Sequence, residues 1–217
     1  PRRPQMLIGP SSLANVAMAA CIAYGLEPED RVLQFASPGF DTIVEEVFPA
    51  LSIGATVVMR PEELFGSFEA FERFSEDQSI TVLDLPTAWW HNWMEDLDGS
   101  GRPLPTPLRM VIVGGEAARS DLWRVWTGLA GDRHWVNSYG PSEGTVVVST
   151  FEPTAAYQPM GQIMPIGRPI QNTTLLVTDS YGHPVPPRVP GELVIEGAPV
   201  AMGYLGDEEA PGFSEGI

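Results

Sequence analysis

The chain has 217 residues, 43% hydrophobic and 18% charged, a composition typical of a globular protein with a substantial core and not of a disordered one. Its 28 acidic and 12 basic residues give a formal net charge of −16, and the basic residues do not cluster, which argues against nucleic-acid binding. The longest apolar stretch, residues 16–26, is too short to cross a bilayer, and no secretory signal pattern is recognised, so we expect a cytoplasmic protein. The single cysteine, Cys21, excludes an internal disulfide and a thiolate zinc site and is expected in the core.

The first two-thirds of the chain alternates between helical and strand patterns. Expected helices begin at capping or first-turn residues, namely Ser11 or Ser12, Asp41, Ser67, Pro86 and Ser120. Gly25 and Gly54 are expected to end the first two helices, and Pro49 to bend or shorten the second. Short apolar runs predict strands over residues 31–35, 55–59, 80–84, 109–113 and 134–137. Helices between successive strands require crossover connections, so the sequence predicts an α/β fold with a doubly wound, mainly parallel sheet flanked by helices.

The pattern changes after Tyr139. Strands are expected over residues 145–151, 173–179 and 191–195, separated by proline- and glycine-containing turns instead of helices. We therefore expect a smaller, antiparallel, β-rich region after the α/β part.

Polar residues and glycines follow several of the expected parallel strands. Asp84 ends one strand, residues 114–116 (GGE) follow another, and residues 137–143 (NSYGPSE) follow the last. Asp41 and Glu45 are four residues apart and therefore share a helix face. Open parallel sheets bind ligands beyond the carboxyl ends of their strands, so the sequence predicts an acidic cleft where glycines admit a ligand close to the backbone.

Residues 137–143 resemble the NxYGPTE signature of adenylate-forming enzymes, particularly the adenylation domains of nonribosomal peptide synthetases. Further motifs of that family match in the same order at residues 40–48 (FDTIVEEVF), 113–117 (VGGEA), 166–173 (IGRPIQNT), 191–197 (GELVIEG) and 203–205 (GYL). Such an ordered series along nearly the whole chain is far more specific than any one motif. The resemblance implies an amino-acid- and ATP-binding α/β subdomain over residues 1–144 and a β-rich continuation of the adenylation core over residues 145–217.

The resemblance also implies roles for individual residues. Asp41 would hold the α-amino group of an amino acid, and the side-chain pocket would be lined by Thr42, Glu45, Asp84, Ile112, Gly114, Ser138, Val146 and Val147. Tyr139 would stack on adenine, and Asn137 would hydrogen-bond to its edge. The remaining nucleotide-binding residues would be Gly115, Glu116, Ala117, Gly140, Ser142 and Glu143. Ser142, where the family usually has threonine, would contact the α-phosphate, and Glu143 would hold Mg²⁺.

The implied activity is that of an ATP-dependent ligase, which forms an aminoacyl-AMP and loads the amino acid onto the phosphopantetheine thiol of a peptidyl carrier protein, as in antibiotic biosynthesis. An MbtH-like accessory protein is a further partner suggested by the resemblance. The phosphate loop, the ribose-binding aspartate and the lysine-bearing lid of the family are expected outside residues 1–217, and residues 197–202 (GAPVAM) lack the usual glycine and arginine. We therefore assign no catalytic residue here and expect the fragment alone to be inactive.

Charge predicts the substrate class. If Asp41 holds the α-amino group, Glu45 and Asp84 are two further carboxylates in a pocket otherwise lined mainly by apolar residues. Two neighbouring carboxylates raise each other's pKa, and burial raises both pKa values further. A cationic side chain of the substrate would offset the charge repulsion and the cost of burial. With Gly114 expected to leave room for a long chain, lysine is predicted ahead of ornithine, diaminobutyrate and β-lysine, while arginine needs more space.

Other interpretations stay open from the residues alone. Asp41 is also a plausible helix cap, Glu45 a solvated carboxylate and Asp84 a turn residue. Tryptophans 89, 90 and 93 are expected to serve core and surface packing instead of forming a stacking platform, and the scattered histidines 91, 134 and 183 predict neither a metal site nor a triad. The alternative function is a catalytically incompetent, flavodoxin-like subdomain that binds a ligand or partner; a dinucleotide is disfavoured because GxGxxG is missing.

Overall fold

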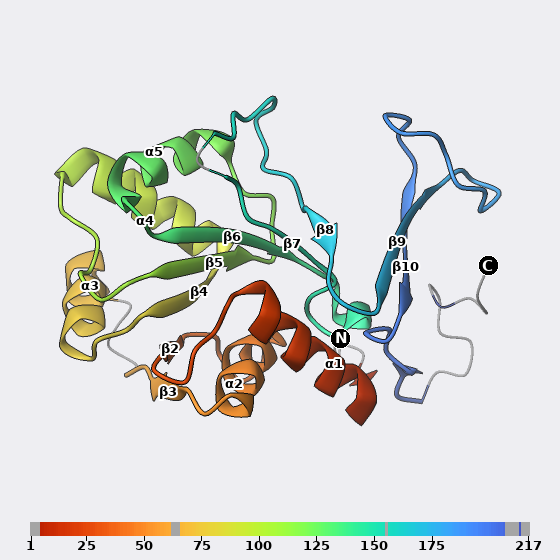
Figure 1. Cartoon of the computed structure of the whole chain (residues 1–217), viewed down its shortest axis with the longest axis horizontal. Coiled ribbons are helices and arrows are strands. Elements are labelled where there is room, and N and C mark those ends of the chain that lie inside the picture. Colours follow the sequence, from red (N-terminus) through yellow and green to blue (C-terminus); the bar gives the residue numbers. More distant parts are fainter. Residues whose placement is uncertain (1–4, 62–65, 155, 207–212, 214–217) are drawn as a thin grey trace.

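The computed structural model describes residues 5–61, 66–154, 156–206 and 213 (Figure 1). Within these ranges the main sheet has seven strands, in the order β3-β2-β4-β5-β6-β7-β8. The parallel strands are β2 (Arg31–Gln34), β3 (Thr56–Met59), β4 (Val82–Pro86), β5 (Met110–Gly114) and β6 (His134–Tyr139). β7 (Ser149–Phe151) pairs antiparallel with β6, and β8 (Arg168–Pro169) pairs antiparallel with β7. The predicted α/β fold with a mainly parallel sheet is confirmed.

Helices cover both faces of this sheet (Figure 1). They are α1 (Pro10–Ala23), α2 (Thr42–Ser52), α3 (Phe68–Asp77), α4 (Thr87–Ser100) and α5 (Ser120–Ala130). Leu83 and Val111 pack with α3, α4 and α5 in one apolar cluster, whereas Val82 and Ile112 pack with α1 and α2 in another. Since successive strand side chains point to opposite faces, this alternation fixes which strand residues lie toward α1 and α2.

The helix ends follow local chemistry, with two departures from expectation. Ser67 caps α3 as predicted, since its hydroxyl accepts the Ala70 N–H at 3.2 Å. α1 begins at Pro10 and not at a serine cap, because proline is preorganised for the first helical position. α2 runs past Pro49 to Ser52, so the proline does not end it. None of the helices in the described ranges has the length and apolar content needed to cross a membrane.

The tryptophans of α4 pack in the apolar cluster that contains Leu83 and Val111, as predicted. Trp90 and Trp93 are fully buried. The Trp93 ring lies 5.3 Å from that of Phe71, edge to face, and the Trp90 ring lies 5.5 Å from that of Trp135. Cys21 is also buried, as expected for a small core residue.

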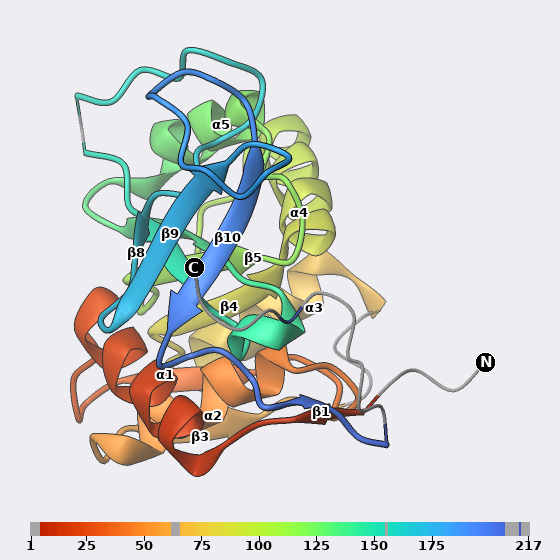
Figure 2. The same cartoon turned by 90° about the vertical axis from the view of Figure 1, so that its right-hand side faces the viewer.

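The region after β6 is antiparallel, as predicted. β9 (Thr173–Thr178) pairs with β10 (Glu192–Gly197) in a separate hairpin, which Figure 2 shows side by side, and β1 (Met6–Leu7) pairs with β11 (Gly203–Tyr204). The strand expected over residues 145–151 is wrong in its first half. Thr145 and Val146 have φ of 52° and 72°, a left-handed conformation that a strand does not allow, so β7 begins only at Ser149. β7 and β8 belong to the main sheet, so this sheet continues past the subdomain boundary that was expected between residues 144 and 145.

Gly167 provides a test of the contact between β7 and the strand β8 that follows. Its φ is +86°, and an added Cβ would lie 1.9 Å from the Thr150 carbonyl oxygen. Gly182 has a similar φ of +81°, yet no described atom lies within 4 Å of an added Cβ there. We expect Gly182→Ala to lower the free energy of unfolding by about 1–2 kcal/mol from backbone strain alone, and Gly167→Ala by clearly more. Denaturant unfolding of both variants checks this, and equal losses would contradict the close contact.

Candidate functional site

The carboxyl ends of β4, β5 and β6 meet at one edge of the sheet, against α1 and α2. Asp84 pairs with Ile112 across β4 and β5, and Pro86 pairs with Gly114. Asp84 alternates with Leu83 and Leu85, which belong to the opposite cluster, so its side chain lies toward α1 and α2. The sheet register therefore brings one strand carboxylate to the layer that carries Glu45.

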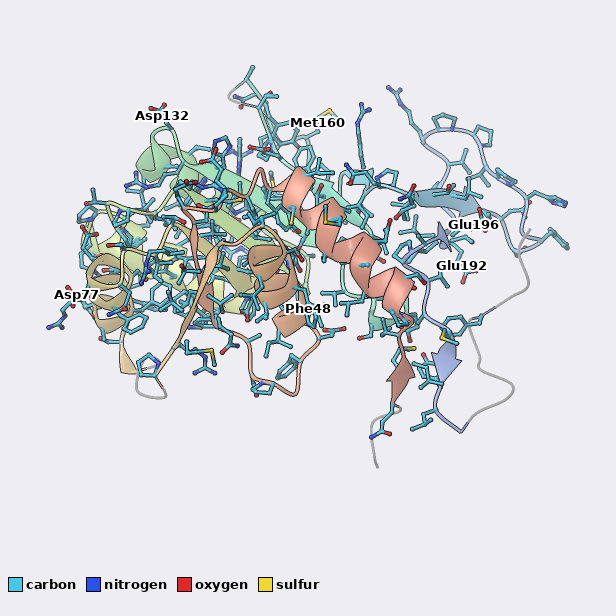
Figure 3. The ribbon with its side chains drawn as sticks, turned by 60° about the horizontal axis from the view of Figure 1, so that its bottom comes forward. Phe48, Asp77, Asp132, Met160, Glu192 and Glu196 are labelled. Carbon is cyan, nitrogen blue, oxygen red and sulfur yellow. The ribbon has the colours of Figure 1, made fainter. Side chains whose placement is uncertain are left out.

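A buried acidic cluster occupies this position. Glu45 is 6% exposed, Asp84 2% and Tyr24, which directly follows α1, 1%. The Tyr24 hydroxyl donates a hydrogen bond to Glu45 Oε1. Neither carboxyl oxygen of Asp84 has a hydrogen-bond partner among the described residues. By contrast, Asp77, Asp132 and Glu192 lie on the exterior (Figure 3), so Glu45 and Asp84 are exceptional in a chain whose acids are mostly solvated.

Burial changes the protonation of both acids. It raises the pKa of Glu45 to about 7; the hydrogen bonds from Tyr24 and Ser138 oppose that rise, and the charges of Glu46 and Asp41 add to it. Burial also raises the pKa of Asp84 well above its usual range, and Glu45 and Glu46 add to that shift. Because like charges in a desolvated site disfavour each other's ionisation, the cluster favours the protonated forms of both acids more than water does. A cation bound there would favour release of these protons.

Gly114 lies against Ser138. A Cβ at this position would lie 2.5 Å from the Ser138 hydroxyl oxygen and 3.2 Å from the Ser138 carbonyl oxygen, so a larger residue here would have to displace Ser138. The room that Gly114 would leave for a long substrate side chain stays a prediction. Ile112 is buried in the cluster that contains Tyr24.

The other expected pocket residues lie around this cluster. Val147 is buried and Val146 is half-buried, and both pack against Val16 and Ala19 of α1. Thr42 is half-buried at the first position of α2. Helix α1 therefore supports Val146 and Val147, a contribution that the motif comparison in the sequence did not include.

Asp41 and Ser142 meet although 101 residues separate them in the chain. The Ser142 hydroxyl donates a hydrogen bond to Asp41 Oδ2, while the Asp41 side chain forms no capping bond to α2 in the described part of the chain. Glu143 is held from another direction: the Tyr204 hydroxyl donates to Glu143 Oε1, and the Ala201 N–H donates to the Glu143 carbonyl at 2.7 Å. The residues expected to contact an amino group and a phosphate thus lie directly beside each other.

The remaining expected nucleotide residues form the rim next to β5 and β6. Gly115, Glu116 and Ala117 form an exposed loop, which the Thr87 hydroxyl anchors by donating to the carbonyls of Gly114 at 2.9 Å and Glu116 at 3.1 Å. This loop turns at Gly115, where φ is +92°.

Asn137, Tyr139 and Gly140 complete that rim. Asn137 Nδ2 donates to the Pro165 carbonyl at 2.8 Å, and its buried Oδ1 has no hydrogen-bond partner in the described ranges. Tyr139 is half-buried at the end of β6. A Cβ on Gly140 would lie 2.2 Å from the Val146 carbonyl oxygen, so the backbone of residues 140–147 folds tightly beneath this rim.

A metal ion at this site would need oxygen ligands from a bound nucleotide in addition to those of the protein. The described residues contain no group of three or more His, Cys, Asp or Glu side chains placed to hold a metal. Glu143 alone supplies one carboxylate, which suits Mg²⁺ because that ion binds one or two carboxylates and completes its shell with water and phosphate oxygens.

Sequence reasoning missed Glu46 and Tyr24. Glu46 is 1% exposed and accepts hydrogen bonds from the N–H groups of Phe35 at 2.9 Å and Ala36 at 2.7 Å, so it fixes the loop that leads to Asp41. Its position four residues before Ala50, on the buried face of α2, was an available signal. Tyr24 likewise lies four residues after Ala20 on the apolar face of α1, where a buried tyrosine needs a partner for its hydroxyl.

Comparison with known proteins agrees with this arrangement. A sequence model described as AMP-binding enzyme matches residues 10–205. The chain is 38% identical over 203 residues to an isonitrile lipopeptide synthase of Streptomyces coeruleorubidus, covering 92% of this chain and 13% of the synthase. The chain therefore spans a small part of that relative.

Two solved structures share the fold. One is NpsA-ThdA, an artificially fused adenylation–PCP di-domain NRPS from Klebsiella oxytoca, with a TM-score of 0.79 and 26% identity over 92% of this chain and 39% of that one. The other is the AMPPNP-bound form of the nonribosomal peptide synthetase FmoA3 (S1046A), with a TM-score of 0.86 and 25% identity over 94% of this chain and 22% of that one.

The buried acids predict a pH-dependent stability. Because the pKa of Glu45 rises from 4.5 to about 7 on folding, its contribution to stability is present below pH 4.5 and is lost as the pH rises through 7. Glu45→Gln removes this loss, so the free energy of unfolding of the variant relative to wild type should increase by about 1–3 kcal/mol between pH 5 and pH 8. Glu29→Gln, at an exposed glutamate, controls for net charge. Parallel pH profiles for wild type and Glu45→Gln would contradict the burial of an ionisable Glu45.

Proposed function

The chain belongs to the AMP-binding enzyme family, and we propose that the protein containing it is an ATP-dependent ligase that adenylates an amino acid in nonribosomal peptide synthesis. In this reaction a carboxylate oxygen of the amino acid bonds to the α-phosphorus of ATP, the bond from that phosphorus to the pyrophosphate oxygen breaks, and pyrophosphate leaves. A carrier-protein thiol then attacks the carbonyl carbon of the aminoacyl-AMP, and AMP leaves as the thioester forms. The ordered motifs and the similarity to an adenylation–PCP protein support this proposal.

The observation that carries the proposal is the contact between Asp41 and Ser142. Asp41 would bind the α-amino group and Ser142 the α-phosphate. Their hydrogen bond means that both ligand groups would sit within a few ångströms of each other, as the attack of a carboxylate on a phosphorus requires. Amino-acid-dependent exchange of pyrophosphate with ATP by the complete protein tests this, and the absence of exchange with every common amino acid would refute it.

The rim beside β5 and β6 would bind the nucleotide. Tyr139 would stack on adenine, and Asn137 Oδ1, which has no hydrogen-bond partner among the described residues, would accept a hydrogen bond from its edge. The exposed loop of Gly115, Glu116 and Ala117 would line the base, and the tight backbone at Gly140 would place Ser142 at the α-phosphate. The similarity to an AMPPNP-bound synthetase supports the use of ATP.

Glu143 would hold Mg²⁺ together with the nucleotide phosphates. The ion would supply positive charge to the phosphate oxygens during displacement of pyrophosphate. The Tyr204 hydroxyl donates to Oε1 of Glu143, so Tyr204 would orient the carboxylate and leave its other oxygen for the ion.

We propose that the substrate carries a positive side chain. A neutral substrate would leave Glu45 and Asp84 buried without compensation, which is costly. A cation near Asp84 would provide the partner that its two oxygens lack within the described structure. Lysine fits first, followed by ornithine, diaminobutyrate and β-lysine.

A carrier protein would accept the aminoacyl group as a thioester. An MbtH-like partner and a cytoplasmic location are expected from the sequence alone.

The proposed function predicts a dependence of activity on the charge of the substrate side chain. Asp84→Asn in the complete enzyme should lower the kcat/KM for lysine relative to norleucine, its uncharged analogue, by about tenfold or more, because a surviving ion-pair energy of about 1.4 kcal/mol gives that factor. The wild-type kcat/KM for lysine should also rise with pH through about 7 as Glu45 ionises, while that for norleucine does not. Pyrophosphate exchange measures both. A substrate screen in which apolar or acidic amino acids exceed lysine and ornithine would overturn the cationic assignment.

A further prediction concerns the metal. Glu143→Gln should raise the Mg²⁺ concentration needed for half-maximal exchange and lower kcat at limiting Mg²⁺ by about one to two orders of magnitude, with little change in KM for the amino acid. Glu192→Gln, at an exposed position on β10, is the matched control (Figure 3). An unchanged Mg²⁺ dependence in Glu143→Gln would remove Glu143 from the metal site.

A further inference from the structure

Tyr24 lies at the centre of the acidic cluster but belongs to no motif of the sequence. It follows the last residue of α1, is 1% exposed, and packs in the apolar cluster with Ala20 and Ile112. Figure 1 shows α1 beside α2, which carries Glu45. Because a buried aromatic side chain has little rotational freedom, the Tyr24 hydroxyl is held at one place against Glu45 Oε1.

The two acids of the cluster differ in their surroundings. Glu45 accepts a hydrogen bond from Tyr24, and Ser138 acts on it in the same sense, whereas Asp84 has no hydrogen-bond partner among the residues described. The other charged groups that act on these acids are Glu46 and Asp41, both negative. In the described part of the chain, the groups that act on Glu45 are thus hydrogen-bond donors and negative charges, with no cation among them.

The hydrogen-bond partner of Glu45 is a neutral tyrosine and not a cation. An arginine or lysine beside Glu45 would neutralise it and remove its attraction for a cationic ligand. A tyrosine hydroxyl donates one hydrogen bond, which favours the carboxylate form and fixes its orientation while the negative charge remains. Tyr24 thus provides a hydrogen-bond donor to one oxygen of Glu45 without neutralising the negative charge that would attract a ligand cation.

We propose that Tyr24 is a positioning and specificity-determining residue of the amino-acid site: it fixes the Glu45 carboxylate so that Glu45 and the unpartnered Asp84 together receive the distal ammonium group of the substrate. This inference rests on the proposed cationic substrate. Asp84 makes the direct contact through its carboxyl oxygens, which have no hydrogen-bond partner among the described residues, and Glu45, restrained by Tyr24, supplies the second negative charge at a fixed distance.

Tyr24→Phe in the complete enzyme tests this role, because it removes the hydroxyl and keeps the ring packing. The ratio of kcat/KM for lysine to that for norleucine, measured by pyrophosphate exchange, should fall about tenfold, mainly through a higher KM for lysine, while kcat stays within about twofold. Tyr181→Phe, at a tyrosine that is 84% exposed, is the matched control and should change neither. A purely structural hydroxyl would shift lysine and norleucine equally.

Glu45→Asp provides an independent test that leaves α1 intact. It keeps the charge but shortens the side chain by one methylene, which withdraws the carboxylate from Tyr24, so it should lower the lysine preference to a similar degree. Adding Tyr24→Phe to Glu45→Asp should then have little further effect, because both changes break the same contact. If Tyr24→Phe does not fold, full retention of the lysine preference by Glu45→Asp would still refute the role of the contact.

The outcomes separate the two proposals. A wild-type enzyme that does not prefer lysine to norleucine would refute the cationic substrate class. A wild-type enzyme that does prefer lysine, with Tyr24→Phe or Glu45→Asp retaining that full preference or losing activity equally on both substrates, would refute the role of Tyr24 and leave the substrate class standing.

Discussion

The parallel register of β4, β5 and β6 determines where the chemistry of this chain is placed. It sets Asp84 beside Ile112 and brings the strand ends to one edge of the sheet. Side-chain alternation then sends Leu83 and Leu85 into the cluster beneath α4 and turns Asp84 toward α1 and α2. A shift of one residue would exchange these faces and separate Asp84 from Glu45. The buried acidic cluster depends on that register.

Two ionisable acids in such a position reduce the stability of the ligand-free protein. Burial raises both pKa values, and the charge of Glu45 raises the pKa of Asp84 further. A core built only for stability would replace them with apolar side chains of similar volume. The proposed cationic substrate would compensate them, and the same groups would then link the stability of the fold to the selection of a substrate.

Contacts between distant segments hold the rest of the site together. Asp41 meets Ser142, and Glu143 meets Tyr204, across long stretches of chain. The left-handed residues Thr145 and Val146 and the close approach of Gly140 to Val146 end β6 with a tight turn, where a strand was expected. This turn places Ser142 and Glu143 over the sheet edge instead of extending them along it. Glu46 fixes the opposite side by binding the backbone before Asp41.

The sequence by itself determined the alternation of helices and strands, the parallel sheet and the family, because periodicity and motif order are local and survive without coordinates. It also identified Glu45 and Asp84 as unusual acids. The tertiary structure alone decided that Tyr24 binds Glu45, that Ser138 lies against Gly114, and that residues 145–148 are not a strand. These features depend on which side chains meet across the α1, α2 and sheet layers, and spacing along one chain does not encode such contacts between elements.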